Sequence, residues 1–540
     1  MLDRPADLIL VADQVHTMSP GAPATAVAIR DGVILAVGAQ IDMEEFAGPD
    51  TRSVSFPGAT IVPGLSDGHA HPLSGAGFTV GVDLRGVSSL PELRRALSTA
   101  LDHLKPGGWL QGWGLDHNAW GTERVTSAPL DEICGTVPSL LRFFDAHSAL
   151  ASKAALSTAG ISEPRTFPTG SRVDADGSGN PTGLLLEAEA MQLVIDVLPP
   201  EPIEDRARRV KVLLSEMAAS GLTSMQVMDF LEEPFEVLRL IEAEGDLPLR
   251  LRFSPWVEPK HSEADWARML DWQGTGGRRW KIHGVKFFLD GTIDGGTAWL
   301  DAPDTHGQST HSTWSNPADY AAAVEFFAAN GVGTATHAIG DAAIRFAVET
   351  LTRVRATHGD APVHRIEHLE TLPNDLLQAV AVSGAVASMQ PTHCTHFVRA
   401  DHTDNWSERL GPSRTKDAWR TRSLADAGVT LALGSDWPVA DFEPLAIMAD
   451  AQLRRNVARP DLEPVGPQEA LSALQALEAY TMGSATAAGV AQTEGSISVG
   501  KVADLTVLAA DPLAIPPAQL VDTPVLATVV DGEIQFAATG

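Results

Sequence analysis

The stretch that decides the fold is PGLSDGHAHP, residues 63–72, in which a short extended segment ends in His69-Ala70-His71. Residues two apart in a β-strand face the same way. His69 and His71 can therefore present their imidazoles to one ion, while Ala70 faces elsewhere. Taken alone, such a pair also fits a solvated loop or hydrogen-bonded core histidines, so its meaning depends on the rest of the chain.

Seven further segments have the composition of buried strands, and stretches with helical periodicity, such as 318–331 and 341–354, lie between them. Eight parallel strands alternating with helices are the number that closes a (β/α)8 TIM barrel, so we predict an α/β fold of that type. The first two strands are far apart in sequence, which predicts an insertion at about residues 72–200. The eight predicted strands are residues 64–71, 221–229, 249–257, 282–291, 331–337, 362–368, 385–391 and 429–436.

Both ends of the chain are rich in short β-type segments with Gly-containing turns, such as Asp31-Gly32 and Asp531-Gly532. Neither end has enough strand to bury both faces of a sheet. We therefore predict one small discontinuous β-sandwich, built from residues 1–63 and 491–540, flanking a barrel domain of residues 64–490.

The composition excludes several classes of protein. The 540 residues are 44% hydrophobic and contain 39 Lys plus Arg against 69 Asp plus Glu, a formal net charge of −30. This charge disfavours nucleic acid and anionic membrane as partners. No apolar run is long enough for a membrane span, and no signal peptide is evident, so we expect a cytoplasmic protein. Neither a dinucleotide-binding glycine motif nor a P-loop is present in a suitable context.

Cys134 and Cys394 are the only cysteines, too few for a disulfide framework or a four-cysteine zinc site. A metal would have to use other ligands, and polar residues of suitable type lie at the carboxyl ends of the predicted strands, the face that carries the chemistry of such barrels. Histidine and carboxylate ligands suit zinc, and also Fe, Mn, Ni or Co, at one or two sites. The candidate metal-binding residues are His69, His71, Lys286, His337, His368 and Asp436.

Lys286 is the unusual member of this set. An ammonium group beside dications is electrostatically unfavourable and would be driven neutral. The alternative is a surface or phosphate-binding lysine.

The ordered motifs PGLSDGHAHP, GVKFFLDG, THAIGDAA, HRIEHLE, SMQPTH and GSDWP, followed by GSISVGKVADLTVL, closely resemble the YtcJ-like, amidohydrolase-3 branch of the amidohydrolase superfamily, which includes N-substituted formamide deformylase-like proteins. The resemblance covers essentially the whole chain. It implies that His69, His71 and Asp436 bind one metal, that His337 and His368 bind a second, and that Lys286 bridges them as an N-carboxylated lysine. D-aminoacylase relatives use a cysteine ligand, but neither cysteine here fits that placement, and we expect Cys394 to be a small packed residue.

The expected reaction is hydrolysis of a non-peptide C–N bond in an N-acyl or N-formyl amine, a cyclic amide or a carbamate. A metal lowers the pKa of its bound water from about 15.7 toward 7, and the hydroxide attacks the carbonyl. Asp436 would take the proton and return it to the departing nitrogen. His393 is either an oxyanion or substrate contact or an ordinary loop histidine. The alternatives are ester or lactone hydrolysis by the same hydroxide, and a catalytically silent metal-binding scaffold.

Aromatic and polar residues of the insertion are expected to form a lid over the site, with core packing as the alternative for the tryptophans. If they line the cavity, the small-molecule substrate has an apolar or aryl portion. A homodimer is the default assembly. The residues expected to contact substrate are Trp113, Asp116, Trp120, His147 and Trp437.

Overall fold

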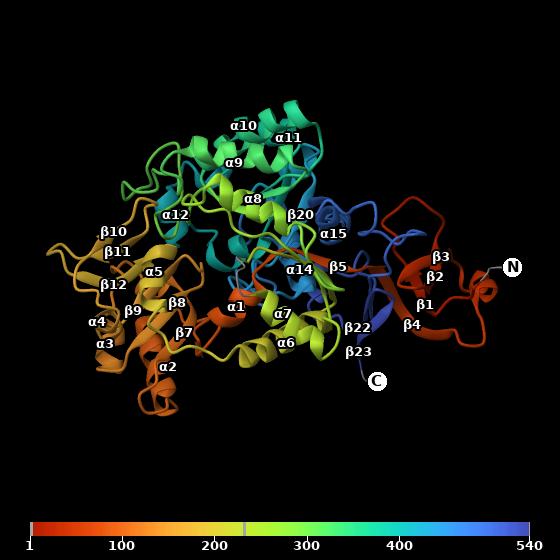
Figure 1. The fold of residues 1–540 in the computed structure, drawn as a ribbon, viewed down its shortest axis with the longest axis horizontal. Coiled ribbons are helices and arrows are strands. Elements are labelled where there is room, and N and C mark those ends of the chain that lie inside the picture. Colours follow the sequence, from red (N-terminus) through yellow and green to blue (C-terminus); the bar gives the residue numbers. More distant parts are fainter. Residues whose placement is uncertain (1–3, 230–233, 539–540) are drawn as a thin grey trace.

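The computed structural model describes residues 4–229 and 234–538 and has three parts arranged along its longest axis (Figure 1). Parallel strands surrounded by helices form the middle. A sheet made from both ends of the chain lies on one side, and the insertion that follows the first parallel strand lies on the other.

The parallel strands of the middle part form two sheets. At one margin the Asp436 amide donates to the His69 carbonyl at 2.8 Å, and at the other the Lys286 amide donates to the Pro255 carbonyl at 2.8 Å. The predicted α/β class is confirmed, and each predicted strand overlaps one of these strands, whereas the strand Trp280–Ile282 lies mostly outside the predicted ranges. In sheet order they are β15 (Trp280–Ile282), β14 (Arg250–Phe253), β13 (Leu222–Val227) and β5 (Leu65–Ala70), then β16 (Val285–Phe288), β17 (Thr334–Ala338), β18 (Arg365–His368), β19 (Val386–Met389) and β20 (Leu431–Leu433).

Alternation along these strands separates apolar from polar side chains. Phe287 belongs to the large apolar core and packs edge-on against Tyr320 of a helix, with ring centroids 5.3 Å apart, whereas its neighbour Lys286 belongs to the polar set at the centre of the strands. The helices cover the apolar side. They are α6 (Ile203–Ala219), α7 (Pro234–Ala243), α8 (Glu263–Trp272), α9 (Pro317–Ala329), α10 (Asp341–His358), α11 (Asn374–Ser383), α13 (Thr421–Asp426) and α14 (Pro444–Leu453).

The two ends of the chain share one seven-stranded sheet, in which β4 and β21 pair antiparallel and so join the ends. The Asp31-Gly32 and Asp531-Gly532 pairs have positive φ throughout, as a tight hairpin turn requires, which confirms these two predicted turns. In order, the strands are β23 (Glu533–Ala537), β22 (Val525–Val530), β21 (Leu505–Leu508), β4 (Arg52–Pro63), β1 (Leu8–Val15), β2 (Ala24–Arg30) and β3 (Val33–Gly38).

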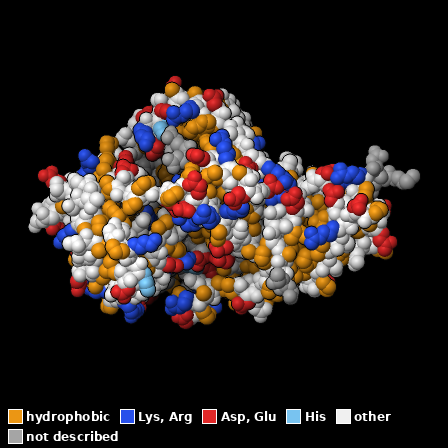
Figure 2. Space-filling view, turned by 60° about the horizontal axis from the view of Figure 1, so that its bottom comes forward, with side chains coloured by type: hydrophobic (Ala, Val, Ile, Leu, Met, Phe, Trp, Pro, Cys, Tyr) orange, Lys and Arg blue, Asp and Glu red, His pale blue; other side chains and the backbone are white. Residues whose placement is uncertain are grey.

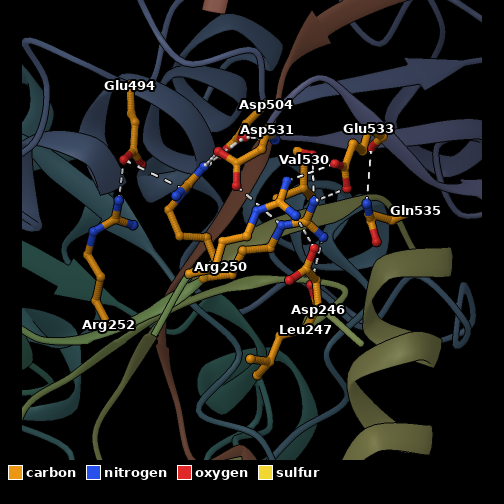
Figure 3. Close-up of polar contacts among 12 residues, drawn as sticks. Asp246, Leu247, Arg250, Arg252, Glu494, Asp504, Val530, Asp531, Glu533 and Gln535 are labelled. Carbon is orange, nitrogen blue, oxygen red and sulfur yellow. Dashed lines mark hydrogen bonds and ion pairs between the residues drawn. The ribbon is translucent and has the colours of Figure 1, made fainter. Parts of the chain in front are cut away.

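Ion pairs join this terminal sheet to the parallel strands (Figure 3). Arg250 of β14 lies 3.0 Å from the carboxylate of Asp504 and also pairs with Asp531, while Arg252 pairs with Glu494. The fully buried Arg279 lies 2.7 Å from Glu533. Because these guanidinium groups are largely removed from water, loss of any carboxylate partner would leave a poorly compensated charge.

The insertion is built on a second seven-stranded sheet with helices packed on it. Its strands, in sheet order, are β10 (Arg165–Thr166), β11 (Arg172–Ala175), β12 (Pro181–Leu186), β9 (Ser148–Ala151), β8 (Ser139–Phe143), β7 (Leu110–Leu115) and β6 (Val82–Asp83); its helices include α2 (Leu90–Asp102), α3 (Ala128–Cys134), α4 (Lys153–Thr158) and α5 (Ala188–Ile195). The short helix α1 (Pro72–Phe78) connects β5 to it.

The surface seen in Figure 2 carries acidic and basic side chains interspersed with apolar ones. Within the described ranges, no helix combines the length and apolarity needed to cross a membrane.

Candidate metal centre

The carboxylate of Asp436 lies among four histidines that come from distant parts of the chain. Its Oδ1 is 3.4 Å from His69 Nε2 and 3.2 Å from His71 Nε2. Its Oδ2 is 3.8 Å from His368 Nδ1 and 3.7 Å from His393 Nε2. Four imidazole nitrogens around one carboxylate form a set of ligand atoms that suits a divalent metal.

The backbone at the ends of β18 and β20 contributes to this convergence. His368 has φ +77° and Asp436 has φ +55°, values that are uncommon for residues other than glycine. Such conformations cluster at functional sites because the surrounding structure holds them there. Both residues lie at or just after the end of a strand, and both side chains face the centre.

Two buried carboxylates orient the first histidine pair. Glu367 Oε2 accepts from His69 Nδ1 at 2.7 Å, and Asp229 Oδ1 accepts from His71 Nδ1 at 3.2 Å. Each bond fixes the ring and leaves Nε2 free to face Asp436, the arrangement typical of metal-binding histidines. Arg365 Nε lies 2.8 Å from Glu367 Oε1 and so completes a buried chain from guanidinium to imidazole.

Sequence reasoning missed Glu367 and Asp229 as functional residues. The signal was available: both lie within the predicted strands, and Glu367 directly precedes a predicted ligand. A carboxylate in a buried strand requires a partner, and a nearby histidine supplies one.

Lys286 lies at the centre of the parallel strands with its side chain fully buried. Its Nζ has no hydrogen-bond partner among the described residues and lies 4.9 Å from the centroid of the Phe288 ring. Burial lowers the pKa of Lys286 to about 8, against the opposing effect of Glu367 and Asp436. The neutral amine is therefore easier to reach than in an exposed lysine.

The converging atoms divide into two groups, each lying within 4.8 Å: His69, His71 and Asp436, and His368, His393 and Asp436. The second group contains His393, which belongs to the π-helix at His393–Phe397. The sequence predicts His337 in this position beside His368. The Nε2 of His337 instead lies 3.1 Å from the Gly291 carbonyl, although its ring centroid is 4.5 Å from that of His368.

Unpartnered buried atoms provide a test of whether a metal fits. Among the described residues, His368 Nδ1, His393 Nε2 and Lys286 Nζ are buried without hydrogen-bond partners. Leaving such groups unsatisfied is unfavourable unless something else binds them. The donor set and these three atoms fit one or two divalent ions.

A pocket opens on this centre. Phe144 of the insertion and Phe397 stack at 3.7 Å between ring centroids in its wall, and Trp406 lies 5.4 Å from Trp419. The pocket is lined by Phe144, Asp145, His147, Thr292, Asp294, His337, Ile339, His368, Glu370, His393, Phe397, Val398, Trp406, Trp419, Asp436 and Val439.

Of the five predicted substrate contacts, His147 lines this pocket. Its Nδ1 lies 2.9 Å from Glu187 Oε2, and although burial alone would lower the pKa of His147, Glu187 raises it to about 9.

The other four predicted contacts lie elsewhere. Trp120 packs in the core of the insertion, and Trp437 packs in the main core against Gly75. Trp113 lies under the Arg85 guanidinium at 4.5 Å, and Asp116 caps a short 3-10 helix by accepting from the Asn118 amide. Trp120 is thus packed as the core-packing alternative expects, and Trp437 also packs in a core cluster. Cys394 is also fully buried, in an apolar cluster, as expected.

Comparison with known proteins adds to this geometry. The model of the amidohydrolase family (Amidohydro_3) matches residues 57–536. The chain is 29% identical to putative amidohydrolase YtcJ of Bacillus subtilis, over 97% of this chain and 98% of the relative. It is 29% identical to N-substituted formamide deformylase of Arthrobacter pascens, over 99% of both chains. It is also 31% identical to protein LONG AFTER FAR-RED 3 of Arabidopsis thaliana, over 93% of this chain and 87% of that one.

Among solved structures, an uncharacterized metal-dependent hydrolase from Pyrococcus horikoshii superposes with a TM-score of 0.72 at 24% identity, covering 94% of this chain and 99% of that one. A zinc-bound adenosine deaminase from Xanthomonas campestris superposes with a TM-score of 0.55 at 16% identity, covering 99% and 94%. These likenesses establish the fold.

Proposed function

This chain belongs to the amidohydrolase family and is a hydrolase of carbon–nitrogen bonds, and we propose that it cleaves an N-acyl or N-formyl amine, or a related small amide, at the centre around Asp436. The observation that carries the proposal is the position of Asp436, whose two oxygens lie within 3.8 Å of nitrogens from four histidines. The name of the deformylase relative favours formamides among the amides.

His69 and His71 would hold one ion with Asp436, and His368 would hold a second with His393 or His337. We propose zinc, and the Lys286 amine would add to carbon dioxide to give a carbamate that serves as an oxygen ligand, since this buried amine has no other partner among the described residues. When bound, such an ion acts as a Lewis acid that lowers the pKa of water and polarises a carbonyl.

Asp436 would move the proton. Burial alone would raise the pKa of this carboxylate, but His69 and His71 hold it well below its usual value, so the carboxylate is ionised and can accept a proton. In the proposed reaction one oxygen of Asp436 accepts the proton of the attacking water and then delivers it to the departing nitrogen, because an amine leaves poorly without protonation.

We also propose how the two parallel sheets combine and which segments form each domain. We take the two parallel sheets as arcs of one eight-stranded barrel, with β15 and β16 as two pieces of one interrupted strand, since backbone hydrogen bonds join the sheets on both sides. The barrel would span residues 64–490 with the insertion at 72–200, and the terminal segments 1–63 and 491–540 would form one domain.

The test is metal analysis of the purified protein together with a hydrolysis screen. The screen pairs each N-substituted amide with the ester of the same acyl group, and it includes formamides of aliphatic and aryl amines. We expect one or two metal equivalents and turnover of amides that stops when a chelator removes the metal. Turnover of esters without any amide would favour the esterase alternative, and metal binding without any turnover would favour the scaffold.

A further inference from the structure

The pocket beside the metal centre has carboxylates in excess of those that the proposed reaction uses. Asp436 belongs to the metal centre, and Asp145 is partnered by His117 at 3.4 Å and by Ser148. Glu370 and Asp294 remain. Both line the pocket and neither belongs to a group of converging metal ligands among the described residues.

Each of these two carboxylates is anchored by a neutral donor. Trp406 Nε1 donates to Glu370 Oε2 at 2.7 Å, and Asn405 Nδ2 donates to Asp294 Oδ1 at 2.9 Å. Glu370 is only 5% exposed, and its Oε1 has no hydrogen-bond partner among the described residues. This oxygen is nevertheless not completely enclosed by protein atoms. Since Glu370 lines the pocket, this oxygen is available to a bound molecule.

Glu370 has no Lys, Arg or His partner among the described contacts, whereas the buried His117 acts electrostatically on Asp294. No Lys or Arg is among the described residues that line the pocket, and the charge of His147 is already matched by Glu187. A buried carboxylate such as Glu370 whose described partner is a neutral donor is unfavourable, and a cationic ligand would relieve that cost.

The rest of the wall is aromatic. Trp406 carries the indole that anchors Glu370, and Trp419, Phe144 and Phe397 lie in the same lining. Aromatic faces attract organic cations, most strongly when water is excluded. Carboxylates combined with aromatic faces form the chemistry that recognises an alkylated or aryl-substituted ammonium group.

We infer that this pocket is a cation site, in which Glu370 and Asp294 receive an ammonium group and the four aromatic rings receive the apolar portion that bears it. The substrates would then be amides that also carry a protonated amine beside an aryl or alkyl group. This step to substrates rests on the proposed amide hydrolysis, whereas the binding of the cation does not.

The test measures binding rather than turnover. Benzyltrimethylammonium, which cannot coordinate a metal, and the neutral benzyl methyl ether are titrated into the metal-loaded protein by calorimetry. We expect the cation to bind at least ~10-fold more tightly than the ether. Glu370→Gln and Asp294→Asn should each reduce that preference several-fold, while Glu408→Gln, the same chemical change at an exposed position of the helix that carries Trp406, should leave it unchanged.

Metal content and thermal unfolding of each variant verify that the centre and fold are intact, and retention of the carboxylate in Glu370→Asp should restore part of the preference. Equal affinity for cation and ether, no cation binding up to ~10 mM, or an unchanged preference in both carboxylate variants would overturn the inference. Cation binding in a protein that cleaves no amide would refute only the proposed function. Amide cleavage without a cation preference would refute only the cation site.

Discussion

Replacing Glu367 with glutamine should weaken both the fold around the centre and its hold on metal. Glu367 is fully buried between Arg365, whose Nε lies 2.8 Å from Oε1, and His69, whose Nδ1 lies 2.7 Å from Oε2. Glutamine has nearly the same shape but no charge, so the Arg365 guanidinium would be left buried without a negative partner. Breaking a buried ion pair on one side costs about 3–5 kcal/mol, and we expect the urea midpoint of the metal-free protein to fall accordingly.

The effect on metal binding has a separate origin. Glutamine still offers an amide oxygen to the Nδ1–H group of His69, but it lacks the negative charge that increases the basicity of the ring. Loss of such a partner reduces metal affinity by about 10–100-fold, or about 1.4–2.7 kcal/mol. Competition for zinc against a chelator of known affinity measures this directly, whatever the substrate.

A double variant separates the two effects. Arg365→Met together with Glu367→Gln removes both charges and should recover much of the lost stability, because neutral side chains of similar size often replace a buried ion pair without cost. It should not recover metal affinity, since His69 still lacks its carboxylate. Glu349→Gln, an exposed change on α10, serves as the control. Parent-like metal affinity in Glu367→Gln would refute the assigned role.

Three further predictions concern the same centre. Asp436→Asn should lower kcat by about 10²–10⁴-fold in an assay of any amide that the parent hydrolyses, since the proton shuttle is lost, and parent-like turnover would contradict the mechanism. Elemental analysis of His393→Asn and His337→Asn should show which histidine binds the second metal, because only the variant that lacks the ligand loses that metal equivalent. The observed grouping predicts that His393→Asn loses it, and an unchanged metal content in this variant would exclude His393 as a ligand. The folded-state pKa of His147 is raised from 6.5 to about 9 by Glu187, so its stabilisation, at most about 3 kcal/mol, is complete below pH 6.5 and is lost as the pH rises through 9. Urea unfolding of the parent and of His147→Gln at pH 6 and pH 10 should show that only the parent loses this contribution, and equal losses in both would refute the assignment.

Strand periodicity explains why so much of the centre could be predicted. His69 and His71 are two residues apart, and His368 and Asp436 each follow a short buried strand, so a parallel arrangement alone brings them to one edge. The positions of Lys286 and of the parallel strands follow from the same alternation. These features are local in sequence and repeated, which is why they are visible without a structure.

The remaining parts depend on contacts between distant segments. Trp113 and Trp120 have the composition of a substrate lid, but which face of an aromatic residue is buried is decided by packing, and here both pack within the insertion or against its surface. The difference between His337 and His393 is similar in kind. His337 lies at a strand end, whereas His393 enters the centre from a π-helix whose irregular turn no periodicity predicts.

Glu367 and Glu370 differ in their partners, and this difference links the metal centre to the choice of substrate. Glu367 is matched by a cation of the chain itself, and so it acts structurally on His69. Glu370, three residues further on and across the turn at His368, has only the indole of Trp406 as a side-chain donor among the described residues. Since a buried carboxylate requires compensation, the position without a protein cation is the one open to a cation from outside. One short segment, residues 365–370, would thus support the metal ligand on one side and select the substrate on the other.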